Sequence, residues 1–196
     1  MTASHPTSLP PDTRERVLSV AERLAQTRGF NGFSYADIAT ELRLTRASLH
    51  YHFPSKADLG RALIIRYADR FSAALAEIDG REENELAKVT RFIRLYEQEL
   101  VRDRMCLCGM FAAEIETLPE PMRAELRRFF DVGEAWLTDV FRTGGAARRL
   151  RFEGAAGEAA QSLTATLQGA MLLARAYGDS ARFARATERL LAKLVE

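Results

Sequence analysis

The sequence predicts an all-α protein in which a small N-terminal helical domain precedes a larger helical domain. Apolar residues recur at intervals of three and four along most of the 196 residues, which is the spacing of amphipathic helices. No stretch alternates apolar and polar residues as a half-buried strand does. Capping residues, glycines and prolines divide the chain into segments of helix length. A hydrophobic content of 47% is sufficient for a packed core.

Residues 1–11 are polar and rich in proline, and we expect them to form a flexible tail. They contain no apolar core of the length found in signal peptides. No later run approaches the ~20 apolar residues that cross a membrane. The two cysteines cannot build the framework of paired cysteines that secreted domains use. We therefore predict a cytoplasmic protein with no membrane partner.

Residues 12–28 are predicted to form the first helix of the small domain. Val17 and Ala21 recur on its apolar side, and Gly29 follows its last residue. This side should cover a small core shared with the next two helices. We expect the small domain to span residues 12–56.

Two short helices joined by a tight turn are predicted next. Ser34 can cap the first, and Asp37, three residues later, completes a capping box. Thr45 can cap the second, which Pro54 ends. Two such helices, the second with a polar outer side, form the helix-turn-helix arrangement that reads DNA.

The outer side of the second short helix carries groups that suit DNA. Arginine can donate to guanine edges or phosphates, and a small alanine allows close approach to a thymine methyl. Ser55 can cap the following helix, so that Lys56 stands in a first turn where a phosphate binds well. The formal net charge is only +1, so attraction to DNA must come from local placement of basic residues. The candidate DNA-contacting residues are Ser34, Thr45, Arg46, Ala47, Ser48, His50, Tyr51, His52 and Lys56.

Residues 57–196 are predicted to form the larger domain. A long helix should run from Ser55 to about Ile78. Gly80 and the charged run after it should form a turn, and another amphipathic helix should follow. A short apolar helix then ends at two prolines, and the next runs over residues 121–141.

Glycines are predicted to separate that helix from the last two. Gly144 and Gly145 should end it, and Gly154 and Gly157 should precede the final pair of helices.

The last two helices have apolar faces and little remaining chain to cover them. We therefore predict a homodimer in which they pair with their symmetry mates as a four-helix bundle. Packing within one chain is the alternative explanation of the same pattern. The candidate interface residues are Leu163, Leu167, Ala170, Ala174, Phe183, Leu190, Leu191 and Leu194.

Large aromatic and flexible side chains gather in the larger domain. They form either ordinary core or the wall of a cavity for a small ligand. Glu114 and Arg175 lie in apolar surroundings, where each could orient a ligand, pair with another side chain or lie at the surface. The candidate effector-pocket residues are Phe71, Phe92, Tyr96, Met105, Cys106, Met110, Phe111, Glu114, Trp136, Met171 and Arg175.

Cys106 and Cys108 have two interpretations. Both can be small buried hydrophobes. Alternatively, Cys106 has a reactive thiolate favoured by Arg102, Arg104 and a helix N-terminus. The three histidines all lie near the N-terminus, far from the cysteines. We therefore expect no metal site, no cofactor and no enzymatic activity.

The residues around the predicted helix-turn-helix resemble the N-terminal pattern of TetR-family transcriptional repressors over residues 14–63. The resemblance implies a dimer formed by the last two long helices, and an effector pocket in the larger domain. It also implies that effector binding shifts the long fourth helix and spreads the two DNA-reading heads. The matching residues are Phe30, Ser34, Asp37, Ile38, Ala39, Leu44, Ser48, Leu49, Tyr51, His52, Phe53, Lys56 and Leu59.

Our leading hypothesis is a ligand-responsive repressor that binds a palindromic double-stranded DNA operator as a homodimer and is released by a small-molecule effector. A reactive electrophile is one such effector, because the segment beginning at Cys106 resembles a TetR-family branch in which some members respond to electrophiles. One rival hypothesis is a helical thiol enzyme or electrophile scavenger that uses Cys106. Another is a dimeric adaptor that binds no DNA.

Overall fold

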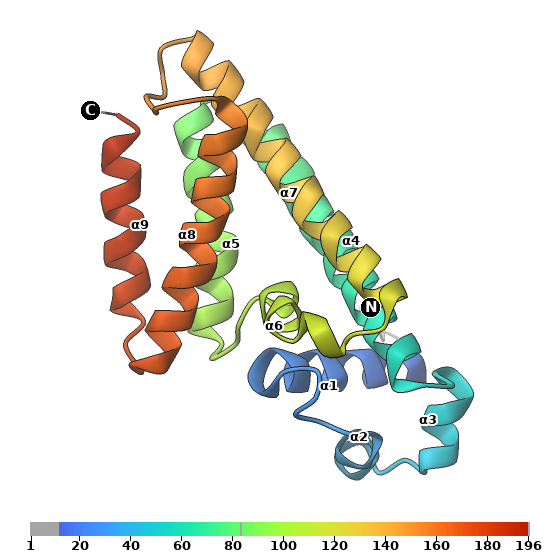
Figure 1. The fold of residues 1–196 in the computed structure, drawn as a ribbon. Helices are drawn as coiled ribbons and strands as arrows, with labels where there is room; N and C mark the ends of the chain where they lie inside the picture. The colour runs from blue at the N-terminus through green and yellow to red at the C-terminus, as the bar shows by residue number, and fades with distance from the viewer. Residues whose placement is uncertain (1–11, 83, 196) are drawn as a thin grey trace, which may run out of the picture.

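The computed structural model describes residues 12–82 and 84–195, and within these residues the chain forms nine α-helices, one 3₁₀ helix and no strand (Figure 1). The all-α prediction is confirmed. The tail predicted over residues 1–11 lies outside the described residues. Among the described helices none is both long and apolar enough to span a membrane.

The N-terminal head consists of α1 (Thr13–Arg28), α2 (Tyr35–Leu42) and α3 (Arg46–His52). Its core contains Ile38 and Leu49, which are 0% and 1% exposed. These residues lie on the apolar sides that the helical spacing predicted, so the head packs as its sequence pattern requires.

The helix α4 (Lys56–Arg81) leaves the head and becomes one long edge of the body. The turn predicted over Gly80 and the charged run after it begins later than expected, because α4 continues through Gly80 and ends at Arg81. One exposed glycine costs a helix about 1 kcal/mol, which does not stop a long helix anchored by buried residues such as Ile78. The next helix, α5 (Glu85–Val101), begins instead where the Asn84 side chain accepts the N–H of Leu86 at 2.8 Å.

A short helix, α6 (Leu107–Ala113), and the 3₁₀ helix η1 (Ile115–Thr117) lead into the long α7 (Glu120–Ala146). The helix end predicted at Gly144 and Gly145 is wrong, because both glycines lie inside α7. A Cβ on Gly144 would come within 2.6 Å of Leu150 Cδ1. This glycine therefore allows the following chain to fold back closely over the helix.

The final helices are α8 (Ala156–Ala176) and α9 (Ala181–Lys193). Gly157, predicted to precede a helix, is in the first turn of α8. Figure 1 shows the head at one end of the molecule and the α7–α8 connection at the other. The helix α6 lies between the body and α1, and it packs against α1, α4 and α7. The body therefore meets the head along α1 as well as through α4.

Candidate nucleic-acid interface

The outer face of α3 is the polar surface that the sequence assigned to DNA. Tyr51 is 85% exposed, and Arg46 and Ala47 are exposed on the same helix. Leu49 packs into the head core on the opposite side. Arg46 has no ion-pair partner among the described residues, so its guanidinium is available to guanine edges or phosphates.

The hydroxyls of Ser34 and Thr45 both cap helices. Ser34 Oγ donates to Asp37 Oδ2 at 2.6 Å, and Thr45 Oγ1 accepts the N–H of Ser48 at 3.2 Å. The hydrogen bonds from Ser34 lower the pKa of the Asp37 carboxyl below its ordinary value. These predicted contact residues therefore also fix where α2 and α3 begin.

The two histidines of α3 pack against neighbouring groups. His50 Nδ1 lies 3.1 Å from the Pro54 carbonyl oxygen, and its ring centroid is 4.8 Å from that of Tyr35. His52 is half-buried, with its ring centroid 5.2 Å from that of Tyr51. The His50 ring therefore helps to hold α3 against α2 and the turn after α3, whereas the ring contact of His52 lies within α3.

Tyr35 is a positioning residue that the sequence reasoning missed. Its hydroxyl donates toward the carbonyl oxygens of Phe53 and Ser55, at 2.8 and 2.7 Å. Burial, and next the negative charge of Asp58, raise the pKa of Tyr35 to about 12. The residue braces the turn between α3 and α4. The available sequence signal was a tyrosine in the first turn of α2, outside the apolar stripe.

Lys56 points back over the head. Its Nζ donates to the Phe33 carbonyl oxygen and lies 4.7 and 4.6 Å from the ring centroids of Phe30 and Phe33. Burial lowers the pKa of this ammonium below its ordinary value. Lys56, predicted among the DNA-contacting residues, therefore has its ammonium engaged inside the head, because a carbonyl and two aromatic faces attract it.

The aromatic residues assigned to the effector pocket pack together in the body. The rings of Phe92 and Trp136 stack with centroids 5.6 Å apart, and Phe71 meets Phe92 edge-on at 5.8 Å. These contacts make an aromatic cluster between α4, α5 and α7. The pocket residues that lie buried in the core are Phe92, Tyr96, Met105, Cys106, Phe111 and Met171.

Glu114 and Arg175 do not join this cluster and bind the head instead. Glu114 accepts the N–H of Phe30 at 2.6 Å, and Arg175 Nη1 donates to the Gln26 carbonyl oxygen at 3.2 Å. Pairing was one of the alternatives open from sequence, but the partners are backbone groups of another domain.

Cys106 is the N-cap of α6, where its Sγ accepts the N–H of Gly109 at 3.4 Å. The side chains of Cys106 and Cys108 are buried, and burial raises the pKa of both thiols. The hypothesis of a thiolate activated by neighbouring arginines is therefore wrong for this conformation. Arg102 instead pairs with Glu99 at 3.5 Å.

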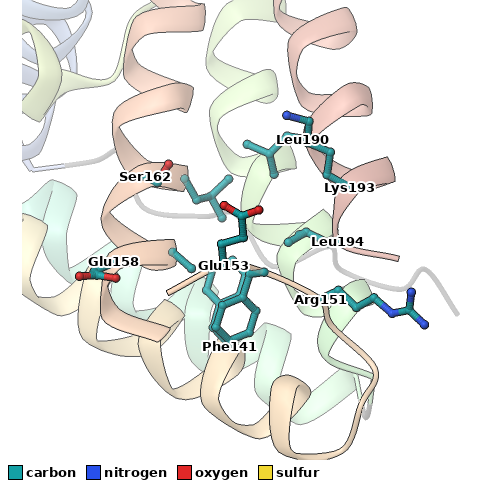
Figure 2. Close-up of a pocket in the computed structure, with 11 residues that line it drawn as sticks. Phe141, Arg151, Glu153, Glu158, Ser162, Leu190, Lys193 and Leu194 are labelled. Atoms are coloured by element: carbon teal, nitrogen blue, oxygen red, sulfur yellow. The ribbon is translucent and has the colours of Figure 1, made fainter. Parts of the chain in front are cut away.

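A pocket of about 630 Å³ lies beside the α7–α8 connection, at the end of the body remote from the head (Figure 1), and Figure 2 shows residues that line it. Three of its residues, Leu163, Leu190 and Leu194, were assigned to the dimer interface. A smaller pocket of about 250 Å³ between α5 and α8 is lined by Met105 and Arg175 from the predicted effector set. The remaining residues of the larger pocket are Phe141, Arg151, Phe152, Glu153, Glu158, Ala159, Ser162 and Lys193.

Most of the residues predicted for the dimer interface lie inside the protomer. Leu190 and Leu191 are half-buried, whereas Leu163, Leu167, Ala170, Ala174, Phe183 and Leu194 are buried. Their burial favours the alternative of packing within one chain, because α5, α7 and the facing terminal helix cover those side chains.

Other apolar groups remain uncovered near the same helices. Leu172, Leu173, Tyr177 and Val195 are 53%, 56%, 64% and 52% exposed.

No group of three or more His, Cys, Asp or Glu is placed to hold a metal within the described part of the chain.

The chain matches two family descriptions over most of its length. Residues 17–63 match "Bacterial regulatory proteins, tetR family", and residues 84–190 match "Tetracyclin repressor-like, C-terminal domain". The first covers α2, α3 and parts of α1 and α4, and the second covers most of the body.

Solved structures of known regulators have the same fold. A TetR-family regulator from Agrobacterium tumefaciens is 36% identical, with a TM-score of 0.90 over 93% of this chain and 97% of that one. A TetR regulator from Legionella pneumophila is 33% identical, with a TM-score of 0.87 over 95% of this chain and 99% of that one.

A relative found by sequence, the transcriptional regulator AcuR of Cereibacter sphaeroides, is 28% identical over 76% of this chain and 69% of its own. The exposed α3 face, the helical body and these matches together show that the protein is a DNA-binding, non-enzymatic transcriptional regulator of the TetR family.

Proposed function

We propose that this protein represses transcription by binding a palindromic operator as a homodimer, and that a small molecule bound in the body releases it. The observation that supports this most directly is the exposed outer face of α3, with Tyr51 and Arg46 free of the head core. Two such helices can enter successive major grooves when they are held about 34–36 Å apart.

We assign base reading to Arg46 and backbone binding to its neighbours. Arg46 lies in the first turn of α3, where a helix placed in the major groove brings side chains to base edges. Ser48, Tyr51 and the capping hydroxyl of Thr45 can bind phosphate oxygens. Lys56 acts in this assignment by supporting the head, where its ammonium binds the Phe33 carbonyl oxygen.

The dimer uses the exposed surfaces of α8 and α9 in this proposal. Leu172, Leu173 and Tyr177 form an apolar strip that the protomer leaves uncovered, and uncovered apolar strips of this kind mark association surfaces. The buried leucines beneath it support the surface.

The effector binds the body in this proposal, where aromatic side chains and pockets offer apolar contacts. Its only thermodynamic requirement is tighter binding to a state in which the heads do not fit the operator. A non-covalent ligand is favoured over an electrophile, because burial of Cys106 and its raised thiol pKa disfavour attack by that sulfur.

Selection from a random DNA pool with the purified chain tests this proposal. A palindrome with half-site centres one or two helical turns apart is expected, and its affinity should fall steeply with salt as counterions are released. A matched selection with Arg46→Ala should return a degraded consensus. Recovery of no preferred sequence by a folded dimer would overturn the proposal in favour of an adaptor.

A further inference from the structure

Side chains of the body bind the head at residues 26–31, the last turn of α1 and the first residues after it; we name this segment the α1–α2 corner. Arg175, near the end of α8, donates Nη1 to the Gln26 carbonyl oxygen at 3.2 Å and Nη2 to that of Thr27. Both carbonyls belong to the last turn of α1, which has no further helix to satisfy them. A cation suits this helix end, where the backbone dipoles are negative.

Glu114 binds the N–H groups of the α1–α2 corner. Its carboxylate accepts the N–H groups of Phe30 at 2.6 Å and Asn31 at 3.2 Å. The Asn31 side chain adds a bond from Nδ2 to Thr117 Oγ1 at 2.8 Å. Hydrogen bonds to an ionised acceptor are the stronger kind. The carboxylate of Glu114 therefore holds the N–H groups of the corner, as Arg175 holds its carbonyl oxygens.

Gly29 makes this approach possible. Its φ of +83° is in the left-handed region, and a Cβ there would lie 2.6 Å from Glu114 Oε1. Any other residue would be strained and would push the carboxylate away. The glycine that the sequence marks as a helix end therefore also seats Glu114.

The buried side chain of Gln26 adds a third set of bonds between the α1–α2 corner and the body. Gln26 is 0% exposed, and its Nε2 donates to Glu99 Oε2 at 2.7 Å and to the Met105 carbonyl oxygen at 3.0 Å. The Met105 N–H returns a bond to the Gln26 carbonyl at 3.3 Å. The corner is thus bonded directly to the turn that precedes Cys106 and α6.

We propose that Glu114 and Arg175 are positioning residues that set the orientation of the DNA-binding head on the body. Attachment through α4 alone leaves the head one covalent connection about which it can turn. The bonds at the α1–α2 corner attach the head to α6 and α8, whereas the ion pair of Glu22 with Arg70 attaches it to α4. Displacement of α6 or α8 then reaches the head through short directional bonds, in addition to any movement of α4.

Distance measurement within one chain tests this directly and needs no DNA. Spin labels are placed at the exposed positions Thr40 on α2 and Ala135 on α7, as Thr40→Cys and Ala135→Cys, with labelled protein diluted into unlabelled protein. Labelled protein that keeps Glu114 and Arg175 should give one narrow distribution of distances between the two labels. Arg175→Met keeps the apolar stem and removes both bonds, and it should broaden or shift the distribution. Arg94→Met, at an exposed arginine of α5, is the matched control and should leave it unchanged.

Operators with altered half-site spacing provide the functional readout. Wild-type protein should lose about tenfold or more in affinity when the selected spacing changes by one base pair, and Arg175→Met should lose most of that discrimination. A purely stabilising role would lower the melting temperature and leave both the spacing preference and the distance distribution intact. That result would overturn the proposal.

Two further results complete the test. If Arg175→Met does not fold, Arg175→Lys retains the charge but not the two-pronged geometry, and an unchanged distance distribution in it would count against the proposal. If wild-type protein selects no operator, the proposed repressor function fails, whereas the distance measurement still decides how the head is held.

Discussion

The carboxylate of Glu22 on α1 forms an ion pair with the guanidinium of Arg70 on α4, and only 8% of the Glu22 side chain is exposed. A second arginine, Arg66, brings its Nε to 3.9 Å from the other carboxylate oxygen. This buried acid joins the first helix of the head to the first helix of the body. Removing a group of this kind leaves its partners unpaired in a partly desolvated place.

Glu22→Gln is therefore expected to lower the free energy of unfolding by about 1–2 kcal/mol, a value reduced because Arg70 is half-exposed. Urea unfolding followed by circular dichroism measures it. Glu77→Gln breaks the exposed pair with Arg81 and should change the free energy by less than about 0.5 kcal/mol. Equal effects of the two substitutions would contradict the importance of burial here.

Tyr35→Phe removes the hydroxyl that braces the turn between α3 and α4. We expect a loss of about 1–2 kcal/mol at neutral pH and weaker binding to the operator. Because folding raises the pKa of Tyr35 to about 12, its contribution is complete below about pH 10 and falls as pH rises toward 12. The stability difference between the wild type and Tyr35→Phe should shrink over that range.

The control for this pH dependence is Tyr51→Phe, at a position of α3 that is 85% exposed and lies outside the proposed dimer surface. Urea unfolding at several pH values between 9 and 12 should show no comparable change for it. A Tyr35 contribution that stays constant to pH 12 would show that its phenol does not titrate with a raised pKa.

Arg46→Ala and Tyr51→Ala should affect DNA binding in different ways. Loss of an arginine that reads a base should cost about 1–3 kcal/mol on the preferred operator and relax the preference at one position of each half-site. Loss of Tyr51, to which we assign a contact with the DNA backbone, should weaken binding to all sequences by a similar factor. Fluorescence anisotropy with the selected operator and single-base variants measures both. An unchanged preference in Arg46→Ala would refute its assignment.

The native thiols should resist alkylation. Cys106 and Cys108 are 2% and 0% exposed, and burial raises the pKa of each. Labelling with iodoacetamide at pH 8 should be slow in the folded protein and reach two thiols per chain in urea. Fast labelling of Cys106 in buffer would reopen the electrophile hypothesis, and Cys106→Ser would then identify the site.

The all-α fold and the helix starts of the head were predictable because the signals are local. The capping box joins Ser34 to Asp37 three residues away, and Thr45 caps Ser48 over the same separation. Such bonds depend on a single helical turn and need no knowledge of distant chain. The exposed face of α3 follows from the same local periodicity.

The sequence by itself therefore determined the helices of the head and the polar outer face of α3. The tertiary structure decided which groups the polar residues of the body bind. Glu114 meets the N–H of Phe30 across 84 residues, and Arg175 meets the Gln26 carbonyl across 149. Which side of α8 stays exposed likewise depended on where α7 and α9 pack against this helix. Helical periodicity specifies that one side of a helix is apolar, but only packing selects the partner that buries it.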